Sequence, residues 1–490
     1  MNMRKSIIKY TLIASCLLAV LPGCKKFVEG GNGNINPNLP SAVTLNTLLP
    51  AVEYVTANGQ ANVGYIVSML SQQMAAYSSG PISEDQYREV RIATGYTTLY
   101  LSGLTNSKAM LDLARKQGSP YYMAISRILF VTNLSLATDT YGDVPLSDAF
   151  LSPQVLYPHY DKQEDLYAYM HKYLDSAITE IGLVNPATVK PGIDDLIYGG
   201  VMSKWKSAAW FLHARLYMHT TKKGAAAAAT SALTALANGF TGNGDDYQLI
   251  FSDKNPNPWF TNVSGRISGS AIFTIGPSKR FIDVMTGVYL GGLIDPRIDT
   301  LVKKATPATA YGGIVNGQGA ASSNNNLTDV TYYGRRIAPL VIGSYSEQKL
   351  MEAEARFLVN GGTTTSVGTT QDTYDAYKAG IIANLNKLGY KDTAYATKPL
   401  VDVGAANLKL EFILREKQVA LFLNPEAWVE VRRYDYDPTL FRGMALPLNI
   451  DPSANNGFIR RSLYPLDEIS RNPNAAAAVK PISEKMWWDQ

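Results

Sequence analysis

Residues 415–433 read REKQVALFLNPEAWVEVRR, which is the most specific pattern in the chain. Apolar residues at helical spacing predict a helix from about Asn407 to Leu423. Beyond that helix, Trp428 is followed by Arg432 and Arg433, a combination that also suits a ligand-binding cluster. Long helices of large folds, however, often bury an aromatic residue beside paired charges. We therefore interpret the cluster as structural and expect an arginine to fork onto a carboxylate in the core.

Amphipathic helices are predicted along most of the chain before this stretch. Apolar residues recur with the period of an α-helix at residues 44–77, 94–118, 120–138, 161–181, 203–219, 225–237, 346–358 and 374–388. We divide the first segment into two helices near Asn58 and Gly59, a turn-forming pair. Such helix pairs resemble tetratricopeptide-like packing, although a strict period of about 34 residues is absent. The sequence thus predicts a mostly α-helical scaffold of tetratricopeptide-like helix pairs.

A loop-rich segment interrupts the helical pattern at about residues 238–340, where Gly, Asn, Ser, Thr and aromatic residues predominate. Excursions this long inside a compact domain are usually functional. We therefore expect a single domain over residues 42–490, in which this loop-rich insertion faces the ligand.

The first residues have the layout of an export signal. A basic start and an apolar run of about a dozen residues lead to Leu21-Pro22-Gly23-Cys24, as in lipoproteins that are acylated on cysteine. The run is too short to span a membrane, which takes roughly 20 residues. We expect residues 1–23 to be removed as a signal peptide and Cys24 to carry fatty acids such as palmitate. Residues 24–41, rich in Gly, Asn and Pro, are expected to form a flexible tether.

Composition excludes several classes of protein. With 46% hydrophobic and 18% charged residues, the chain is typical of a soluble globular protein and not of a membrane channel. Its formal charge is +4, of which the signal peptide supplies +3, so the mature chain is not basic enough to suggest nucleic acid binding. Because Cys24 is the one cysteine of the mature chain, no internal disulfide can form. The 30 tyrosines exceed ordinary usage and suit a wet binding surface.

The sequence contains none of the usual motifs for catalysis, and we expect neither a metal nor a cofactor. The four histidines, at positions 159, 171, 213 and 219, form no His-Glu-x-x-His site. Gly-x-Ser-x-Gly and the phosphate-binding Gly-x-x-x-x-Gly-Lys are also absent. A tethered glycoside hydrolase stays open, because its two acids are neighbours in space and not in sequence. It would require a carboxylate pair about 5 to 10 Å apart in a cleft.

Five segments, in order, resemble the SusD/RagB-like nutrient-binding outer-membrane lipoproteins, and more closely the subgroup called SusD-like starch-binding associated with the outer membrane. The first three segments are 139–145, 295–297 and 347–355. The fourth is the stretch quoted above, and the last is 460–465, followed by Glu468, Asn472 and Asn474. The resemblance extends from the lipid-acceptor cysteine to the C-terminus.

This resemblance implies a helical fold that forms a lid on a SusC-like TonB-dependent transporter and holds oligosaccharide at an aromatic-lined surface, without catalysis. It also implies anchoring in the outer membrane with exposure at the cell surface. Lys25 and Lys26 depart from the acidic residues that tend to follow the lipidated cysteine in surface-exposed members. The membrane leaflet therefore stays open at this point. The same scaffold is also compatible with capture of a peptide or another non-glycan nutrient.

Loop aromatic residues are the expected ligand contacts, because a sugar ring lies flat on Trp or Tyr while its hydroxyls need polar groups at the edge. Trp259 is flanked by Asn257 and Asn262 and is followed by Arg266, so this segment supplies both parts. Further candidates are Tyr87, Arg88, Tyr311, Tyr332 and Tyr333. The alternative for each aromatic residue is that it packs its own loop or touches the transporter. An exposed Trp259 would mean that Trp259→Ala weakens glycan binding by roughly 1 to 3 kcal/mol with stability nearly unchanged.

Overall fold

The computed structural model describes residues 43–77, 81–187, 189–267, 274–304, 308–319 and 325–490. Leu45–Gln490 form one compact unit. The expected signal peptide, Cys24 and the tether lie outside the described residues. None of the described helices is both long and apolar enough to cross a membrane.

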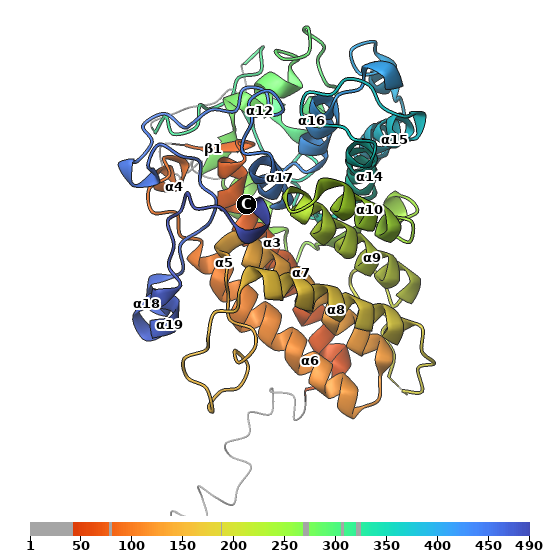
Figure 1. The fold of residues 1–490 in the computed structure, drawn as a ribbon, viewed down its shortest axis with the longest axis vertical. Coiled ribbons are helices and arrows are strands. Elements are labelled where there is room, and N and C mark those ends of the chain that lie inside the picture. The colour runs from red at the N-terminus through yellow and green to blue at the C-terminus, as the bar shows by residue number, and fades with distance from the viewer. Residues whose placement is uncertain (1–42, 78–80, 188, 268–273, 305–307, 320–324) are drawn as a thin grey trace, which may run out of the picture. The chain divides into compact units, whose positions relative to one another are not determined.

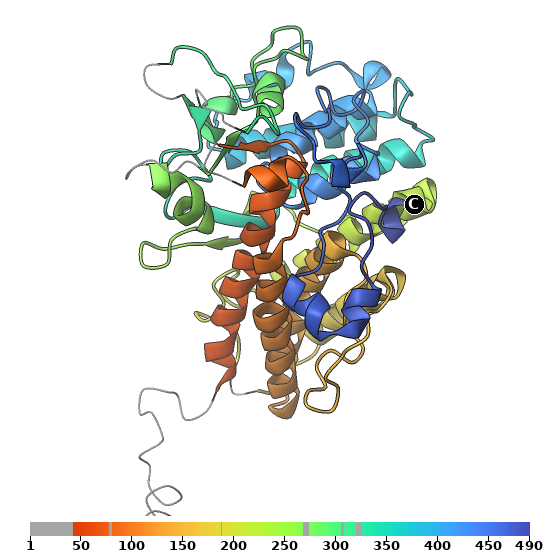
Figure 2. The same ribbon diagram turned by 90° about the vertical axis from the view of Figure 1, so that its left-hand side faces the viewer.

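Helices form a scaffold in which each long one packs against the next long one along the chain, and the five-residue α5 packs against α3 (Figures 1 and 2). They are α3 (Leu45–Leu70), α5 (Ala93–Thr97), α6 (Thr105–Lys116), α7 (Pro120–Tyr141), α8 (Gln163–Ile181), α9 (Met202–His219), α10 (Ala225–Leu236), α14 (Tyr345–Val359) and α15 (Gln371–Lys387). Helix α10 contacts α14 although the whole loop-rich insertion separates them in sequence. The predicted mostly α-helical fold of tetratricopeptide-like pairs is thereby confirmed.

Helix α3 differs from its prediction, because it continues through Asn58 and Gly59 instead of breaking there. A Cβ atom on Gly59 would come within 3.0 Å of the Leu99 side chain in the π-helix η2 (Thr98–Leu104). Glycine therefore permits a close approach between helices and does not mark a turn, so the prediction of two helices was wrong. Helix α7 continues three residues beyond its predicted end at residue 138, to Tyr141, and is followed by Gly142 at a φ of 91°.

The insertion is tied down by short antiparallel pairs of strands, and its two ends lie side by side. Strand β2 (Tyr247–Ile250) pairs with β6 (Pro339–Gly343), while β1 (Met74–Ala76), directly after α3, pairs with β3 (Ile275–Pro277). A third pair joins β4 (Lys303–Lys304) and β5 (Asn325–Asn326). The insertion contains the short helices α11 (Gly265–Ile267), α12 (Lys279–Met285) and α13 (Ile298–Leu301). Another short helix, α4 (Ile82–Asp85), lies before the insertion in the sequence. The β1–β3 pair fixes the middle of the insertion to the end of α3.

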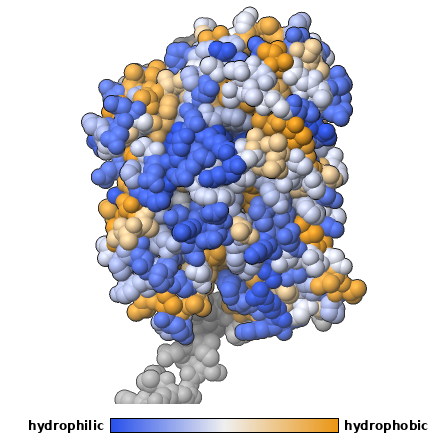
Figure 3. Space-filling model, viewed as in Figure 1, coloured by the Kyte–Doolittle hydropathy of each residue, from blue (hydrophilic) through white to orange (hydrophobic). Residues whose placement is uncertain are grey.

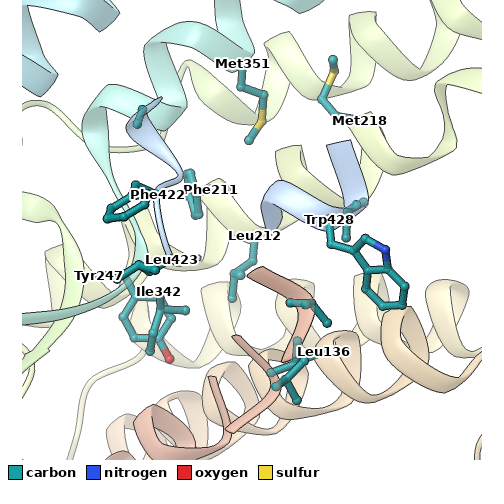
Figure 4. Packing of buried hydrophobic residues seen from close by; sticks show 14 of the residues in the cluster. Leu136, Phe211, Leu212, Met218, Tyr247, Ile342, Met351, Phe422, Leu423 and Trp428 are labelled. Carbon is teal, nitrogen blue, oxygen red and sulfur yellow. The ribbon is translucent and has the colours of Figure 1, made fainter. Parts of the chain in front are cut away.

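The C-terminal part carries α16 (Leu410–Ala420), α17 (Glu426–Arg433), α18 (Leu466–Arg471) and α19 (Pro473–Ala477). Figure 4 shows side chains from α7, α9, α14 and β6 pointing into one core together with Leu423 and Trp428. Trp428 is 2% exposed. The stretch 415–433 thus supplies two consecutive helices at the centre of the molecule.

A cluster of four buried charges confirms the structural interpretation of this stretch. Arg433 forks onto Glu430, with Nη1 2.9 Å from both carboxylate oxygens, and its Nη2 donates to Glu354 on α14 at 2.5 Å. Lys417 on α16 lies 2.8 Å from both Glu354 and Glu430. Burial raises the pKa of Glu354, but Arg433 and Lys417 outweigh this effect and hold it at about 2. We call these four residues the charge cluster.

Two histidines meet between α8 and α9. The Nδ1 atoms of His171 and His213 lie 2.8 Å apart, and the ring of His171 also stacks on Tyr217 with centroids 4.2 Å apart. One ring must donate and the other accept, so at least the accepting imidazole must be neutral. Burial lowers the pKa of each histidine to about 4, and for His171 the neighbouring His213 adds to the effect.

This pair predicts a loss of stability in mild acid. The unfolded chain binds protons on histidine near pH 6.5, whereas the folded pair resists protonation, so its contribution is complete above about pH 6.5 and is lost as the pH falls toward 4. His171→Phe should make the loss of unfolding free energy between pH 7 and pH 5 smaller by about 2 kcal/mol, as measured by urea denaturation at both pH values. His159→Phe, at a histidine whose side chain is 77% exposed, is the control and should change the loss less than His171→Phe does. An unaltered loss in His171→Phe would contradict this account.

Candidate functional site

A polar hollow of about 280 Å³ opens beside α12, and we call it the α12 pocket. Helix α12 lies near β1 at the loop-rich end of the compact unit (Figure 1). The pocket is lined by Gln72, Lys279, Arg280, Asp283, Tyr289, Val315, Asn316, Gly443, Ala445 and Leu446. Segments from four distant parts of the sequence therefore meet there.

The position of α12 follows from the strands before it. Strand β3 pairs with β1, and Ser278, the next residue, caps α12 by accepting a hydrogen bond from the backbone N–H of Phe281 at 3.0 Å. The same hydroxyl donates to the backbone oxygen of Gln72 at 2.5 Å. These contacts place the first turn of α12, with Lys279, Arg280 and Asp283, against the segment that follows α3.

The floor of the pocket is held by a buried carboxylate. Asp85 accepts hydrogen bonds from Asn316 Nδ2 at 2.7 Å and from the backbone N–H groups of Ala76 and Gly317 at 3.1 and 2.8 Å. Burial raises the pKa of Asp85, and these hydrogen bonds oppose that rise. The carboxylate thereby joins β1, α4 and the loop at residues 316–317, so the floor is rigid.

Tyr289 provides the aromatic wall. Its side chain is 37% exposed, and its hydroxyl packs against Gly443, where an added Cβ atom would lie 2.3 Å away. The hydroxyl forms no hydrogen bond with any described residue, so it is available to a ligand. An exposed ring beside unpartnered polar groups is the arrangement that a sugar requires.

Three charged side chains border the ring. Lys279 and Asp283 form an ion pair of 2.6 Å across one turn of α12. Arg280, which is 6% exposed, donates from Nε to the backbone oxygen of Arg442 at 3.1 Å and from Nη2 to Gln418 Oε1 at 2.6 Å. Burial lowers the pKa of Arg280 to about 10, so the guanidinium is charged at neutral pH.

Two other hollows are less suited to a sugar. A cavity of about 350 Å³ between α7 and α8 is walled mainly by apolar side chains such as Phe130, Phe150 and Leu166. Another of about 510 Å³ lies beside Asp435 and Lys222, which are already paired with each other at 2.8 Å. In the α12 pocket Lys279 and Asp283 are paired as well, but the exposed ring lies beside two groups without a partner among the described residues, the hydroxyl of Tyr289 and Nη1 of Arg280.

Trp259 is not an exposed platform. It is 5% exposed, and its ring packs against α3 so closely that a Cβ on Gly64 would lie 3.3 Å from it. Asn257 is fully buried, with Oδ1 accepting from the backbone N–H of Trp259 at 2.7 Å and Nδ2 donating to the backbone oxygen of Ala338 at 3.0 Å. The expected binding pair thus holds its own loop against the scaffold.

The other predicted contacts are divided between the interior and the surface. Tyr87 and Tyr333 are 2% and 6% exposed and cannot stack on a ligand in this conformation. Tyr311 and Tyr332 are half-buried, and the cations of Lys304 and Arg335 lie 4.7 and 5.0 Å from their ring centroids. Arg88 is paired with Asp451 at 2.8 Å, Arg266 is exposed and Asn262 is half-buried. None of these described residues lines the α12 pocket.

The residues that do form the pocket were missed in the sequence. Tyr289 lies between glycines, in Gly287-Val288-Tyr289-Leu290-Gly291-Gly292, and three of these glycines have positive φ. Tight turns on both sides of an aromatic residue lift its ring from the surface. The glycines on both sides of Tyr289 could therefore have indicated an exposed ring, whereas Trp259 was predicted as a contact because asparagines flank it.

A family model described as starch-binding associating with outer membrane matches residues 37–465. The chain belongs to this SusD-like family. Among solved structures, a chitin-binding protein superposes with a TM-score of 0.73 at 23% identity, over 91% of this chain and 100% of its own. A chitin-binding SusD homologue from Flavobacterium johnsoniae gives a TM-score of 0.71 at 20% identity, over 91% and 99% of the two chains.

A SusD/RagB family protein from Bacteroides thetaiotaomicron gives a TM-score of 0.70 at 19% identity, over 91% of this chain and 99% of its own. At these identities the likeness establishes the fold of the SusD-like chain. No curated protein sequence matches it. The resemblance read from five sequence segments is thus confirmed at the level of family and fold.

The burial of Trp259 reverses the expectation for its replacement. Trp259→Ala should lower the free energy of unfolding by about 3 to 5 kcal/mol, because it leaves a cavity between the insertion and α3. Trp259→Phe, which retains an aromatic ring, should cost clearly less. Urea denaturation of both variants measures the difference. A Trp259→Ala protein as stable as the wild type would contradict the packing described here.

Proposed function

We propose that this SusD-like chain is an outer-membrane lipoprotein that binds oligosaccharide in the α12 pocket and delivers it to a SusC-like TonB-dependent transporter. The observation that carries the proposal is the exposed ring of Tyr289 beside Arg280 and the Lys279–Asp283 pair. The ring would stack on the apolar face of a sugar, while the charged groups would bind its hydroxyls.

The comparisons support a glycan as the ligand. The family is described as starch-binding and associated with the outer membrane, and two of the similar structures are described as chitin-binding. In this proposal Cys24 carries the lipid, residues 24–41 span the distance to the domain, and the domain is exposed at the cell surface. Half-buried Tyr311 and Tyr332, with exposed Arg88 and Arg266, are proposed as further contacts to glycan or transporter.

The proposal assigns binding and no catalysis to the pocket. Among its described lining residues, Asp283 alone carries a carboxylate, and Lys279 neutralises it at 2.6 Å. A glycosidase needs two carboxyl groups across the scissile bond, one of them with a raised pKa. This charge arrangement therefore favours a protein that binds glycan and releases it unchanged.

Figure 3 bears on the proposed partner. On the face shown, hydrophobic residues lie in small groups between hydrophilic ones. An interface that forms and breaks is about as apolar as the rest of a protein surface, so a face of this kind suits such a partner without marking where it binds. It is in keeping with a lid that opens to load ligand, as delivery to a transporter requires.

Replacement of Tyr289 tests the binding site. Tyr289→Ala should weaken binding of oligosaccharides by roughly 1 to 3 kcal/mol, by analogy with the stacking of bases on aromatic side chains, and leave the melting temperature nearly unchanged. Isothermal titration calorimetry with a panel of starch, chitin and acidic oligosaccharides measures the effect. Tyr157→Ala removes a ring that is 53% exposed but lies outside the pocket, and it should bind like the wild type. Binding of peptides alone, or of no glycan in the panel, would refute the proposal.

Replacement of Cys24 tests the anchor and the partner. Cys24→Ser should not incorporate radiolabelled palmitate, and it should no longer fractionate with the outer membrane. Wild-type protein extracted in mild detergent should co-purify with a TonB-dependent transporter. Palmitate labelling of Cys24→Ser would contradict the assigned lipid site, and recovery of the anchored wild-type chain alone would contradict delivery to a transporter.

A further inference from the structure

Arg280 is a buried cation without an ionic partner. Its two hydrogen-bond acceptors, the backbone oxygen of Arg442 and Gln418 Oε1, are both neutral. No carboxylate of the described residues forms an ion pair with it. By contrast, the buried arginines at positions 215, 297 and 433 each contact a carboxylate at 2.5 to 2.7 Å.

The neighbouring charges do not compensate for it. Asp283 is occupied by Lys279, and the side chain of Arg442 is paired with Glu411 at 2.7 Å. Asp85, below the floor, is surrounded by the N–H groups of Asn316, Ala76 and Gly317. The residues that line the pocket therefore carry one uncompensated positive charge, at Arg280.

Nη1 of Arg280 is the free arm of the guanidinium. It forms no hydrogen bond to the described residues, whereas Nε and Nη2 are held by Arg442 and Gln418. Two fixed arms pre-orient the third, and Arg280 is one of the residues that line the pocket of about 280 Å³. A guanidinium held in this way costs little further entropy when an anion binds.

Arg432 is a second buried arginine without an ion pair to the described residues, and its surroundings differ from those of Arg280. Its guanidinium lies 3.6 Å from the ring centroid of Trp428 and 4.9 Å from that of Trp488. The adjoining cavity of about 30 Å³ holds no more than a water molecule. Arg280 has no such rings about it, and its cavity is about nine times larger.

We propose that the α12 pocket binds the acidic group of a charged glycan, a carboxylate or a sulfate ester, on Arg280 while Tyr289 stacks on the sugar ring. This inference rests on the proposed function, since it names the class of glycan taken by the same pocket. Because Nε and Nη2 are already held, Nη1 is the donor to the anion, as a charge-assisted hydrogen bond, and the anion supplies the ionic partner that Arg280 lacks.

Matched pairs of oligosaccharides test the charge preference. One pair is tetragalacturonate and its fully methylated ester, and the other is a sulfated carrageenan tetrasaccharide and the corresponding neutral agarose tetrasaccharide. Calorimetry should show the charged member of at least one pair binding about tenfold or more tightly, and the productive pair distinguishes carboxylate from sulfate. That preference should diminish between 50 and 300 mM KCl, because salt screens the attraction between the acidic group and Arg280 wherever the two are in contact with solvent.

Variants at position 280 locate the charge. Arg280→Gln should lose the preference for the charged member, so that the charged and neutral members bind with similar affinity, and Arg280→Lys should retain part of the preference. Arg442→Gln is the matched control, because it removes a neighbouring arginine whose side chain points to Glu411 and leaves the backbone acceptor of Arg280 in place. It should bind both members like the wild type.

The possible failures are distinct. If wild-type protein binds neutral and charged members equally, and loses both in Tyr289→Ala, the proposed glycan-binding function stands and the role of Arg280 is refuted. If no oligosaccharide of either charge binds, the proposed function itself fails. A salt-independent affinity of the wild type for the charged member would also refute the inference, even if Arg280→Gln did not fold.

Discussion

The charge cluster of Glu354, Lys417, Glu430 and Arg433 is the interaction on which the ligand-facing half of the molecule depends. Each cation contacts both carboxylates at 2.5 to 2.9 Å, and all four side chains are at least 97% buried. Taking four charges out of water costs several kcal/mol for each ion, so only the complete set is tolerable, and loss of one member leaves an unpaired charge. The cluster therefore fixes α16 and α17 in one position against α14.

The position of α16 is passed on to the pocket through the residue next to the cluster. Lys417 points to the carboxylates, while Gln418 accepts the hydrogen bond from Arg280 at 2.6 Å. The backbone oxygens of Gln418 and Leu421 also accept from Gln73 Nε2 at 3.2 and 3.1 Å, which holds the segment between α3 and β1. One helix thus links the scaffold, the anchor of the insertion and the cation of the site, and this explains why the most specific stretch of sequence lies outside the pocket.

The helical scaffold could be predicted from the sequence because burial of one helix face leaves a period of 3.6 residues. A buried contact between an arginine and a carboxylate could be predicted because paired charges beside Trp428 need partners, but the identity of the other members of the charge cluster could not. The uninterrupted course of α3 could not be predicted, because a glycine in the sequence looks the same whether it ends a helix or allows close packing of a side chain such as Leu99. Trp259 and Tyr289 show the same limit for the site. Both are aromatic residues in a loop-rich insertion, and only tertiary contacts bury the first at 5% exposure and leave the second at 37%.

Burial of a cation is by itself ambiguous evidence of function, and the contrast between Arg280 and Arg432 shows which further observation resolves it. Both donate to neutral acceptors, and burial lowers the pKa of both. For Arg432 the rings of Trp428 and Trp488 supply the missing stabilisation, so the residue serves to dock the C-terminal segment. Around Arg280 the fold provides open volume where those rings would be. A desolvated charge that faces space for a ligand lowers its own free energy when an anion fills that space, which makes the cost of its burial part of the binding energy.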